Sequence, residues 1–314
     1  MELRQLRYFI VVADAQSITA AARKLHVVQS AISHQMANLE SELGVELLLR
    51  HKTGVQLTAA GQLLYRHAVA VVKHVEAASR EVRLEDKEIR GKVAVGFPNS
   101  TAAVLALPLL KAVRSELPYV DITIMEGLSG LLKEQLTTGR LDLSILFDTD
   151  LLRGFQARLL LAERLHFVSA DPKMRRAFAR ATTIDLRQVL KRPLVLPPQP
   201  NGIRDLLERE ALRADLRPHI IANITGVATM LAAVKAGLAD TVMMAVNASV
   251  GQMANDLLVI PVGAPPIERR AGLFESAQFA LPTAVARVKD ITLRLVDEMI
   301  TAEKWPGARL LDPK

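Results

Sequence analysis

The chain has 314 residues, of which 50% are apolar and 23% charged, a composition typical of a folded protein with more than one domain. It contains no cysteine, which excludes disulfides, thiolate nucleophiles and cysteine-ligated metal centres. The net charge is +7, but residues 1–90 carry 12 basic against 10 acidic side chains, so charge alone does not indicate a nucleic-acid partner.

Several function classes are disfavoured by what the sequence does not contain. The longest apolar run, residues 102–110, includes a proline and is too short to span a membrane. The first residues lack the pattern of a signal peptide, and we therefore expect a cytoplasmic protein with no membrane partner. The seven histidines match no metal-site spacing, and the GxSxG, Walker A, GxGxxG and HExxH motifs are absent. We expect no metal, no cofactor and no enzymatic activity.

Short helices are predicted at the start of the chain. Ser17 can cap a helix over residues 18–25, which ends at a break over residues 26–28. A third helix follows, and residues 47–58 have the pattern of a small hairpin. The third helix is expected to bury an apolar row formed by Ile32, Met36, Leu39 and Leu43. Two short helices joined by a tight turn are typical of a helix-turn-helix.

The outer side of the third helix is polar and small. A glutamine can bond adenine through two atoms, serine can reach base edges or phosphates, and the free N–H groups of a helix start suit a phosphate. An ordinary solvated surface would have the same composition, so spacing alone leaves both interpretations open. The candidate contact residues are Gln29, Ser30, Ser33 and His34.

A long helix is predicted after Thr58, which is a suitable cap. Its apolar residues recur in alternating steps of four and three, a heptad pattern that requires a partner helix. The alternative is a helix packed on its own domain. The charged opposite side and the absence of a neighbouring segment suited to cover the row favour dimerisation. The predicted dimerisation row consists of Leu64, Ala68, Val71, Val75, Ala78 and Val82.

From residue 91 onward, strands and helices alternate, which predicts parallel α/β sheets. Strands are expected at 92–97, 120–125, 141–147, 167–169, 194–196, 219–223 and 241–245, and helices at 101–116, 129–138, 203–212, 226–236 and 283–300. The series divides into two lobes, with chain crossings near residues 162–165 and 267–270.

A cleft between two such lobes is a common ligand site. Several loops that follow strands and open helices carry hydroxyl or amide side chains, which suit a carboxylate or another anion. Each residue could simply be a helix cap, but the set together favours an effector site. The candidates are Asn99, Ser100, Thr101, Ser129, Phe147, Pro200, Asn201 and Thr225.

Residues 17–35, 39–47 and 54–61 together resemble the N-terminal signature of the LysR-type transcriptional regulators. The rest of the chain is similar to that family in plan, with a long linker helix followed by two periplasmic-binding-protein-like lobes. Within the family, residues 96–97, 108–110 and 112–114 are most similar to the nitrogen assimilation control branch.

The resemblance implies an α+β multidomain protein. Its parts would be a winged helix-turn-helix domain over residues 1–58, a linker and dimerisation helix over 59–90, lobe 1 over 91–162 and 268–314, and lobe 2 over 163–267. Such a protein binds double-stranded DNA as a homodimer or homotetramer, responds to a small-molecule effector and acts on RNA polymerase. The implied DNA contacts are Ser17, Thr19, Gln29, Ser30, Ser33 and His34, with Arg50 and Lys52 on the wing.

Two departures from the family pattern affect the charge of this surface. The family commonly has arginine where His34 and Thr53 stand, so we expect weaker phosphate binding than is usual. Two other functions remain as alternatives: a solute-binding or sensing protein whose N-terminal helices serve only assembly, and an enzyme with its site in the cleft. A steep salt dependence of duplex binding would separate the regulator from both.

Overall fold

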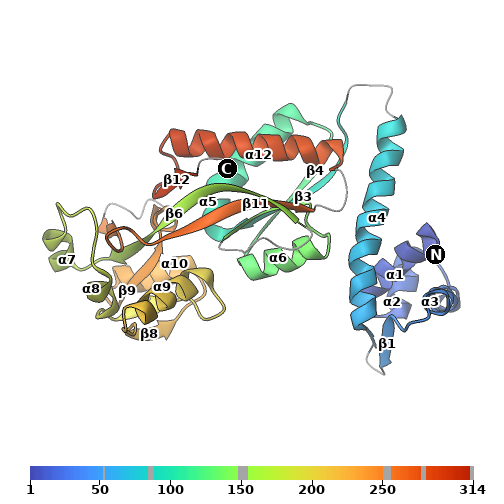
Figure 1. Cartoon of the computed structure of the whole chain (residues 1–314), viewed down its shortest axis with the longest axis horizontal. Helices are drawn as coiled ribbons and strands as arrows, with labels where there is room; N and C mark the ends of the chain where they lie inside the picture. The colour runs from blue at the N-terminus through green and yellow to red at the C-terminus, as the bar shows by residue number, and fades with distance from the viewer. Residues whose placement is uncertain (52–53, 84–87, 148–154, 250–255, 277–280, 312–314) are drawn as a thin grey trace.

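The computed structural model describes residues 1–51, 54–83, 88–147, 155–249, 256–276 and 281–311. Figure 1 shows a helical head with a long helix at one end of the molecule and two α/β lobes extending away from them. Lys52 of the predicted wing lies outside the described residues. No helix in the described part of the chain is long and apolar enough to cross a bilayer.

The head contains three helices and a hairpin, as predicted. These elements are α1 (Leu3–Ala15), α2 (Ile18–Leu25), α3 (Gln29–Leu43), β1 (Leu48–His51) and β2 (Gly54–Leu57). The Ala20 N–H donates to Ser17 Oγ at 3.2 Å, which is the predicted cap of α2. His26 ends α2 in the left-handed conformation, with φ of 55°, and so makes the tight turn into α3.

The predicted apolar row of α3 is buried except at its end. Ile32, Met36 and Leu39 are at most 1% exposed, whereas Leu43 is 39% exposed. The expectation that Leu43 would be buried was therefore wrong. Leu43 is the last residue of the helix, and Gly44 then turns the chain away with φ of 68°.

The hairpin is bound to the helices by hydrogen bonds as well as by apolar contacts. The N–H groups of Leu47 and Leu48 donate to Glu40 Oε1 at 2.8 and 3.0 Å. The Val55 N–H donates to the Gln16 carbonyl at 2.8 Å. A Cβ at Gly54 would lie 2.5 Å from the same carbonyl oxygen, so only glycine fits there. The hairpin therefore has a fixed position relative to α3.

The long helix is α4 (Ala59–Arg83). Thr58 Oγ1 accepts a hydrogen bond from the Gly61 N–H at 2.9 Å, which confirms Thr58 as its cap. The first part of α4 packs against the head, where Tyr65, Ala68 and Val69 are buried. Residues 84–87, which follow the helix, lie outside the described residues.

Lobe 1 is built around parallel strands. Its elements are β3 (Gly91–Pro98), α5 (Asn99–Glu116), β4 (Val120–Gly127), α6 (Ser129–Thr137), β5 (Leu143–Phe147) and α12 (Thr283–Thr301). Strand β3 pairs in parallel with both β4 and β5. Helix α5 begins two residues earlier than predicted, so Asn99 and Ser100 lie in its first turn.

Lobe 2 contains the second α/β series and several short elements that the sequence pattern did not predict. The predicted elements are β7 (Leu194–Leu196), α9 (Gly202–Arg213), β8 (Ile220–Asn223), α10 (Val227–Lys235) and β9 (Asp240–Met244). The others are α7 (Pro172–Ala177), α8 (Leu186–Leu190), α11 (Ala245–Ser249) and β10 (Leu258–Pro261). Periodicity does not identify elements this short.

Two long strands connect the lobes. Strands β6 (Phe155–Ser169) and β11 (Glu268–Ser276) are antiparallel partners and contain the predicted crossings. Strand β6 then continues into lobe 2, where it pairs with β9 and β10. The short strand β12 (Ala308–Leu310) also pairs with β6, beside the buried Trp305. The crossing region is consequently the point where both lobes and the C-terminal segment meet.

Candidate DNA-binding surface and interlobe cleft

The outer side of α3 presents the predicted polar side chains to solvent. Gln29, Ser30 and His34 are exposed, and Ser33 is half-buried. Gln29 Nε2 donates to Ser33 Oγ at 3.2 Å, and Asn38 Nδ2 lies 3.3 Å from His34 Nδ1. Three of the four candidate side chains, Gln29, Ser33 and His34, are therefore held by hydrogen bonds on the surface of α3.

The start of α3 is open to an anion. Val28 precedes the helix, is 69% exposed and provides no side-chain cap. Uncapped N–H groups at a helix start bind phosphate oxygens well. Thr19 is exposed on α2 nearby, whereas the Ser17 hydroxyl is already used as a cap. On the wing, exposed Arg50 has Nη2 4.0 Å from Glu40 Oε2.

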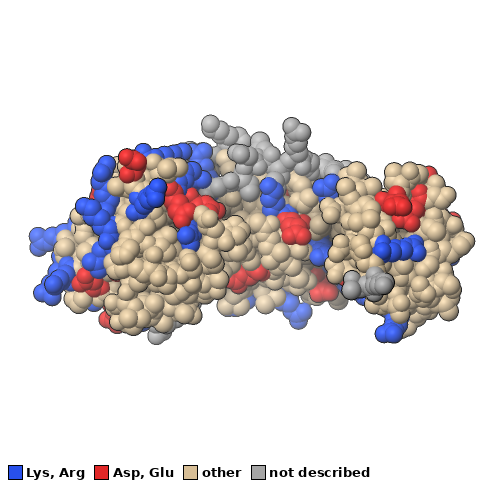
Figure 2. Space-filling model, turned by 90° about the horizontal axis from the view of Figure 1, so that it is seen from below, with Lys and Arg blue, Asp and Glu red and all other residues tan. Residues whose placement is uncertain are grey.

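Charge is not what distinguishes the head. Figure 2 shows Lys and Arg side chains gathered at the end of the molecule formed by lobe 2, with few on this face of the head. This distribution agrees with the near-neutral count for residues 1–90. The arrangement of α3 and the hairpin, and not an electrostatic surplus, therefore defines the candidate DNA-binding surface.

The predicted dimerisation row on α4 divides into two halves. Ala68 is buried in the head, and Leu64 and Val71 are partly buried there. The premise that no neighbouring segment covers the row was thus wrong for this half, because the head covers it. Farther along, Val75, Ala78 and Val82 are exposed, with Val82 86% exposed. The second half remains available to a partner helix.

Lobe 1 contacts the head through the loop that follows α6. Arg140 Nη2 donates to Asp14 Oδ1 at 2.6 Å, and the Tyr65 hydroxyl donates to the same oxygen at 2.6 Å. Arg140 Nε lies 3.3 Å from the Tyr65 hydroxyl oxygen. Burial, followed by the hydrogen bond to Asp14, raises the pKa of Tyr65 above its usual value. Three elements, α1, α4 and the lobe 1 loop, thus meet in one polar cluster.

A second ion pair extends this contact along α4. Lys73 Nζ lies 2.9 Å from Asp142 Oδ1, and Asp142 Oδ2 accepts the Ala94 N–H at 2.8 Å. Between α4 and lobe 1 lies a cavity of 310 Å³. Its helix wall contains Leu63, His67, Ala70 and His74, each one residue before a member of the dimerisation row. One residue turns a helix by about 100°, so lobe 1 and a partner helix would use different sides of α4.

The interlobe cleft has a cavity volume of 530 Å³. Seven of the eight predicted effector residues line it: Asn99, Ser100, Ser129, Phe147, Pro200, Asn201 and Thr225. The eighth, Thr101, is fully buried and does not line the cavity. Its Oγ1 is buried without a hydrogen-bond partner among the described residues. Thr101 is the third residue of α5, and its side chain is buried instead of lining the cleft.

Helix starts surround this cleft. Helices α5, α6 and α10 begin there and have no side-chain cap. Only α9 is capped, by Asn201 Oδ1, which accepts the Ile203 N–H at 3.0 Å and the Arg204 N–H at 3.3 Å. Uncapped helix starts carry partial positive charge and unpaired donors, and so favour a negatively charged group in the cleft.

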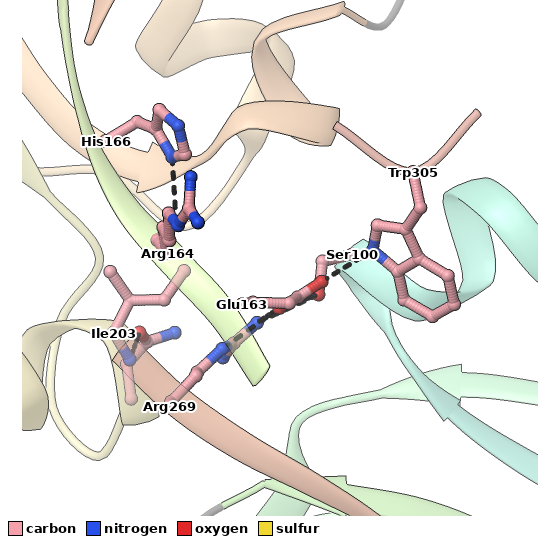
Figure 3. A network of polar contacts seen from close by, with 8 residues as sticks. Ser100, Glu163, Arg164, His166, Ile203, Arg269 and Trp305 are labelled. Carbon is pink, nitrogen blue, oxygen red and sulfur yellow. Dashed lines mark hydrogen bonds and ion pairs between the residues drawn. The ribbon is translucent and has the colours of Figure 1, made fainter. Parts of the chain in front are cut away.

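A buried charged network, which the sequence pattern did not reveal, forms the floor of the cleft (Figure 3). Arg269 Nε and Nη2 donate to Glu163 Oε2 at 3.1 and 2.7 Å, and Nη2 also donates to Ser100 Oγ at 2.8 Å. Trp305 Nε1 donates to Glu163 Oε1 at 2.9 Å. The available signal was Glu163, which directly follows the apolar run 159–162 in a crossing strand, because a buried charge needs a partner.

A helix-turn-helix head joined to a two-lobed α/β ligand-binding domain defines a class of protein, the DNA-binding transcriptional regulators with an effector domain. Residues 3–62 match the family model described as bacterial regulatory helix-turn-helix protein, lysR family. Residues 86–296 match the LysR substrate binding domain. The chain belongs to the LysR family, whose members are transcriptional regulators and not enzymes.

Individual relatives agree with this assignment. The nitrogen assimilation regulatory protein nac of Klebsiella aerogenes is 33% identical over 298 residues, covering 94% of this chain and 95% of the relative. Among solved structures, a full-length OxyR from Pseudomonas aeruginosa has a TM-score of 0.75 at 23% identity, covering 94% of each chain. Full-length CbnR in complex with its target DNA has a TM-score of 0.62 at 24% identity, covering 94% of this chain and 100% of CbnR.

Proposed function

We propose that this regulator reads its DNA site with Gln29, Ser30, Ser33 and His34 of α3. One observation carries the proposal: the apolar row of α3 is buried in the head while the opposite, polar side is free. Ser17 and Thr19 on α2 and Arg50 and Lys52 on the wing would contact the backbone, since phosphate contacts position a protein and base contacts specify the sequence.

The proposal includes a small anionic effector in the interlobe cleft. Three uncapped helix starts and a buried arginine support an anion there. Here the working parts are the head (1–58), the linker (59–90), lobe 1 (91–162 and 268–314) and lobe 2 (163–267). The protein would act in the cytoplasm on RNA polymerase bound near its site.

Helix α6 provides a direct route from effector to DNA. Its first residues, 129–131, line the cleft. The loop that follows its last residue contains Arg140, which donates a hydrogen bond to Asp14 of the head. A ligand shifts an equilibrium only by binding its two states with different affinity. Lobe closure that moves α6 would therefore change the contact with the head, and with it the spacing of two heads on DNA.

The exposed half of the row on α4 supports a homodimer, which could pair again as a homotetramer. Val75, Ala78 and Val82 are apolar or small, exposed and regularly spaced. A dimer would place two α3 helices on two half-sites, the usual arrangement for helix-turn-helix proteins.

The decisive experiment is a genome-wide pull-down of bound DNA, followed by affinity measurements on the recovered site. We expect the logarithm of affinity to fall with the logarithm of salt concentration by about 0.9 per neutralised phosphate. Replacing Gln29 with alanine should cost about 1–3 kcal/mol and relax the preference at one base pair. The control is Gln188→Ala, an exposed glutamine on α8 of lobe 2. Equal effects of both variants would contradict the assignment of α3.

A further inference from the structure

Arg269 is a charged side chain held in an unusual position. It is 6% exposed and lies on β11, one of the two strands that cross between the lobes. Its ion-pair partner Glu163, on β6, is 2% exposed. Glu163 is bonded at both oxygens, Oε1 by Trp305 and Oε2 by Arg269 and Ser100. Removing two charges from water is costly, so such a pair calls for an explanation beyond stability.

One nitrogen of this guanidinium has no hydrogen-bond partner among the residues that the structure describes. Nε and Nη2 are bonded, whereas Nη1 makes no hydrogen bond to any residue in the described part of the chain. Arg269 lines the interlobe cleft. Its guanidinium carbon lies 3.5 Å from the centre of the Phe147 ring, which closes one face of the group. Figure 3 shows the side chain fixed between β6 and the start of α5. The guanidinium is therefore held by several contacts at the lining of the cleft, with Nη1 free of hydrogen bonds to the described residues.

The surroundings of Nη1 limit the net charge of the ligand group that can bind there. Glu163 neutralises Arg269, and the other charged residues that line the cleft, Asp205 and Arg209, have opposite signs, so these four side chains together have no net charge. The Glu163 carboxylate repels any anion near Nη1, and it repels a doubly charged group twice as strongly as a singly charged one. A singly charged group gains a charge-assisted hydrogen bond and the partial charges of the uncapped helix starts. A monoanion with apolar substituents fits, since Ile203, Val227 and Met230 line the same cavity.

We propose that Arg269 is the specificity-determining residue of the cleft, and that it selects a ligand with a carboxylate whose oxygen accepts a hydrogen bond from Nη1. Glu163 and Trp305 are positioning residues that hold the guanidinium plane. This inference rests on the proposed effector site, and it adds the chemical class of the ligand and the atom that recognises it.

The test uses two probes of the same shape, isobutyrate and its neutral amide isobutyramide. Both are titrated into the full-length wild-type chain while the unfolding temperature is measured, since a ligand that binds the folded state raises it. We expect isobutyrate to bind at least about tenfold more tightly than isobutyramide, the effect of one charge-assisted hydrogen bond. Equal responses to the two probes, or no response to isobutyrate in the millimolar range, would overturn the proposal.

Variants then locate the effect. Arg269→Met should abolish the preference for isobutyrate, and the control Arg287→Met, at an exposed arginine on α12, should retain it. Trp305→Phe keeps a buried aromatic ring but removes the donor to Glu163, and it should reduce the preference several-fold while leaving the response to isobutyramide unchanged. A purely structural role of Trp305 would lower both responses together.

The affinity of each variant for the DNA duplex is also measured, with neither isobutyrate nor isobutyramide present. This measurement distinguishes a failure of the Arg269 assignment from a failure of the proposed function. If affinity for the recovered DNA site stays at the wild-type value and Arg269→Met retains the preference, the Arg269 assignment is wrong and the regulator stands. If Arg269→Met does not fold, the wild-type comparison of the two probes still decides the proposal.

Discussion

The side chains on the outer side of α3 are paired with one another in the absence of DNA. Gln29 is bonded to Ser33, and Asn38 lies against His34. These contacts limit rotamer freedom and so reduce the entropy lost on binding. His34 stands where the family commonly has an arginine, so this surface lacks one fixed positive charge. We therefore expect recognition by the proposed surface to depend more on hydrogen bonds to bases than on phosphate attraction.

His166, in the crossing region, gives the protein a predictable pH dependence. It is 6% exposed, its Nδ1 lies 2.8 Å from the Arg164 carbonyl oxygen, and burial lowers its pKa below the usual value. Above about pH 6.5 the imidazole is neutral in both folded and unfolded chains and adds no pH dependence. Below that pH the unfolded chain takes up a proton that the folded chain resists, so the free energy of unfolding falls until the folded pKa is reached.

We expect His166→Gln, which keeps a side-chain donor but does not titrate, to lack this loss of stability. The difference from wild type should amount to about 1.4 kcal/mol for each unit by which the folded pKa is lowered. Denaturant unfolding measures this difference between about pH 5 and 8, the range in which histidine usually titrates. His219→Gln, at an exposed histidine, should behave like wild type. Parallel pH profiles for wild type and His166→Gln would refute the explanation.

At the scale of elements, α4 has three sides with different surroundings. One side of α4 packs against the head, and a second side faces lobe 1. The C-terminal part of its third side contains the exposed residues Val75, Ala78 and Val82. A heptad pattern cannot distinguish these uses, because apolar residues are required for packing on the same chain as much as on a partner.

Val82→Asp should separate the two uses of the row. Because Val82 is 86% exposed in the single chain, the substitution leaves the fold intact, whereas in a dimer it buries an unpaired charge. We expect dimerisation to weaken by on the order of a hundredfold, measured by analytical ultracentrifugation. Gln62→Asp, which adds the same charge at an exposed position on another side of α4, is the control. A dimer unaffected by Val82→Asp would place the interface elsewhere.

The contact between Arg140 and Asp14 joins two functional units. Alanine at both positions and at each separately forms a double-mutant cycle. Because the Arg140 side chain is 48% exposed, the coupling energy should be modest, about 0.5–1 kcal/mol. The clearer effect should be structural: small-angle scattering is expected to show a larger maximum dimension for Arg140→Ala, but not for Arg213→Ala in an exposed pair within α9. Unchanged scattering with additive energies would exclude this contact as a link.

At the scale of the whole molecule, the proposed dimer predicts how its DNA site is spaced. Two heads joined by paired α4 helices would reach two half-sites on one face of the duplex. Inserting five base pairs, about half a helical turn, between the half-sites should lower affinity at least about tenfold, and a full-turn insertion should recover part of it. Gel-shift titration of the three duplexes measures this. Equal affinity for all three would indicate that each head binds alone.

The sequence alone determined most of the elements and the plan of the molecule. Because one side of each element must be buried, apolar residues recur at regular spacing in α3, in the parallel strands of both lobes and in α12. This local pattern can be recognised from the sequence without a structure. Most of the predicted cleft residues were found in the same way, because hydroxyl and amide side chains accumulate where strands end and helices begin.

Only the tertiary structure decided which chemistry lies at the centre of the cleft. Arg269, Glu163 and Trp305 are 36 to 142 residues apart in the chain, and no spacing rule connects them. The same holds for Arg140 and Asp14, and for the half of the α4 row that the head covers. Pairing of buried charges and covering of apolar surface are set by which strands and helices the fold brings together, and a local sequence pattern does not contain that information.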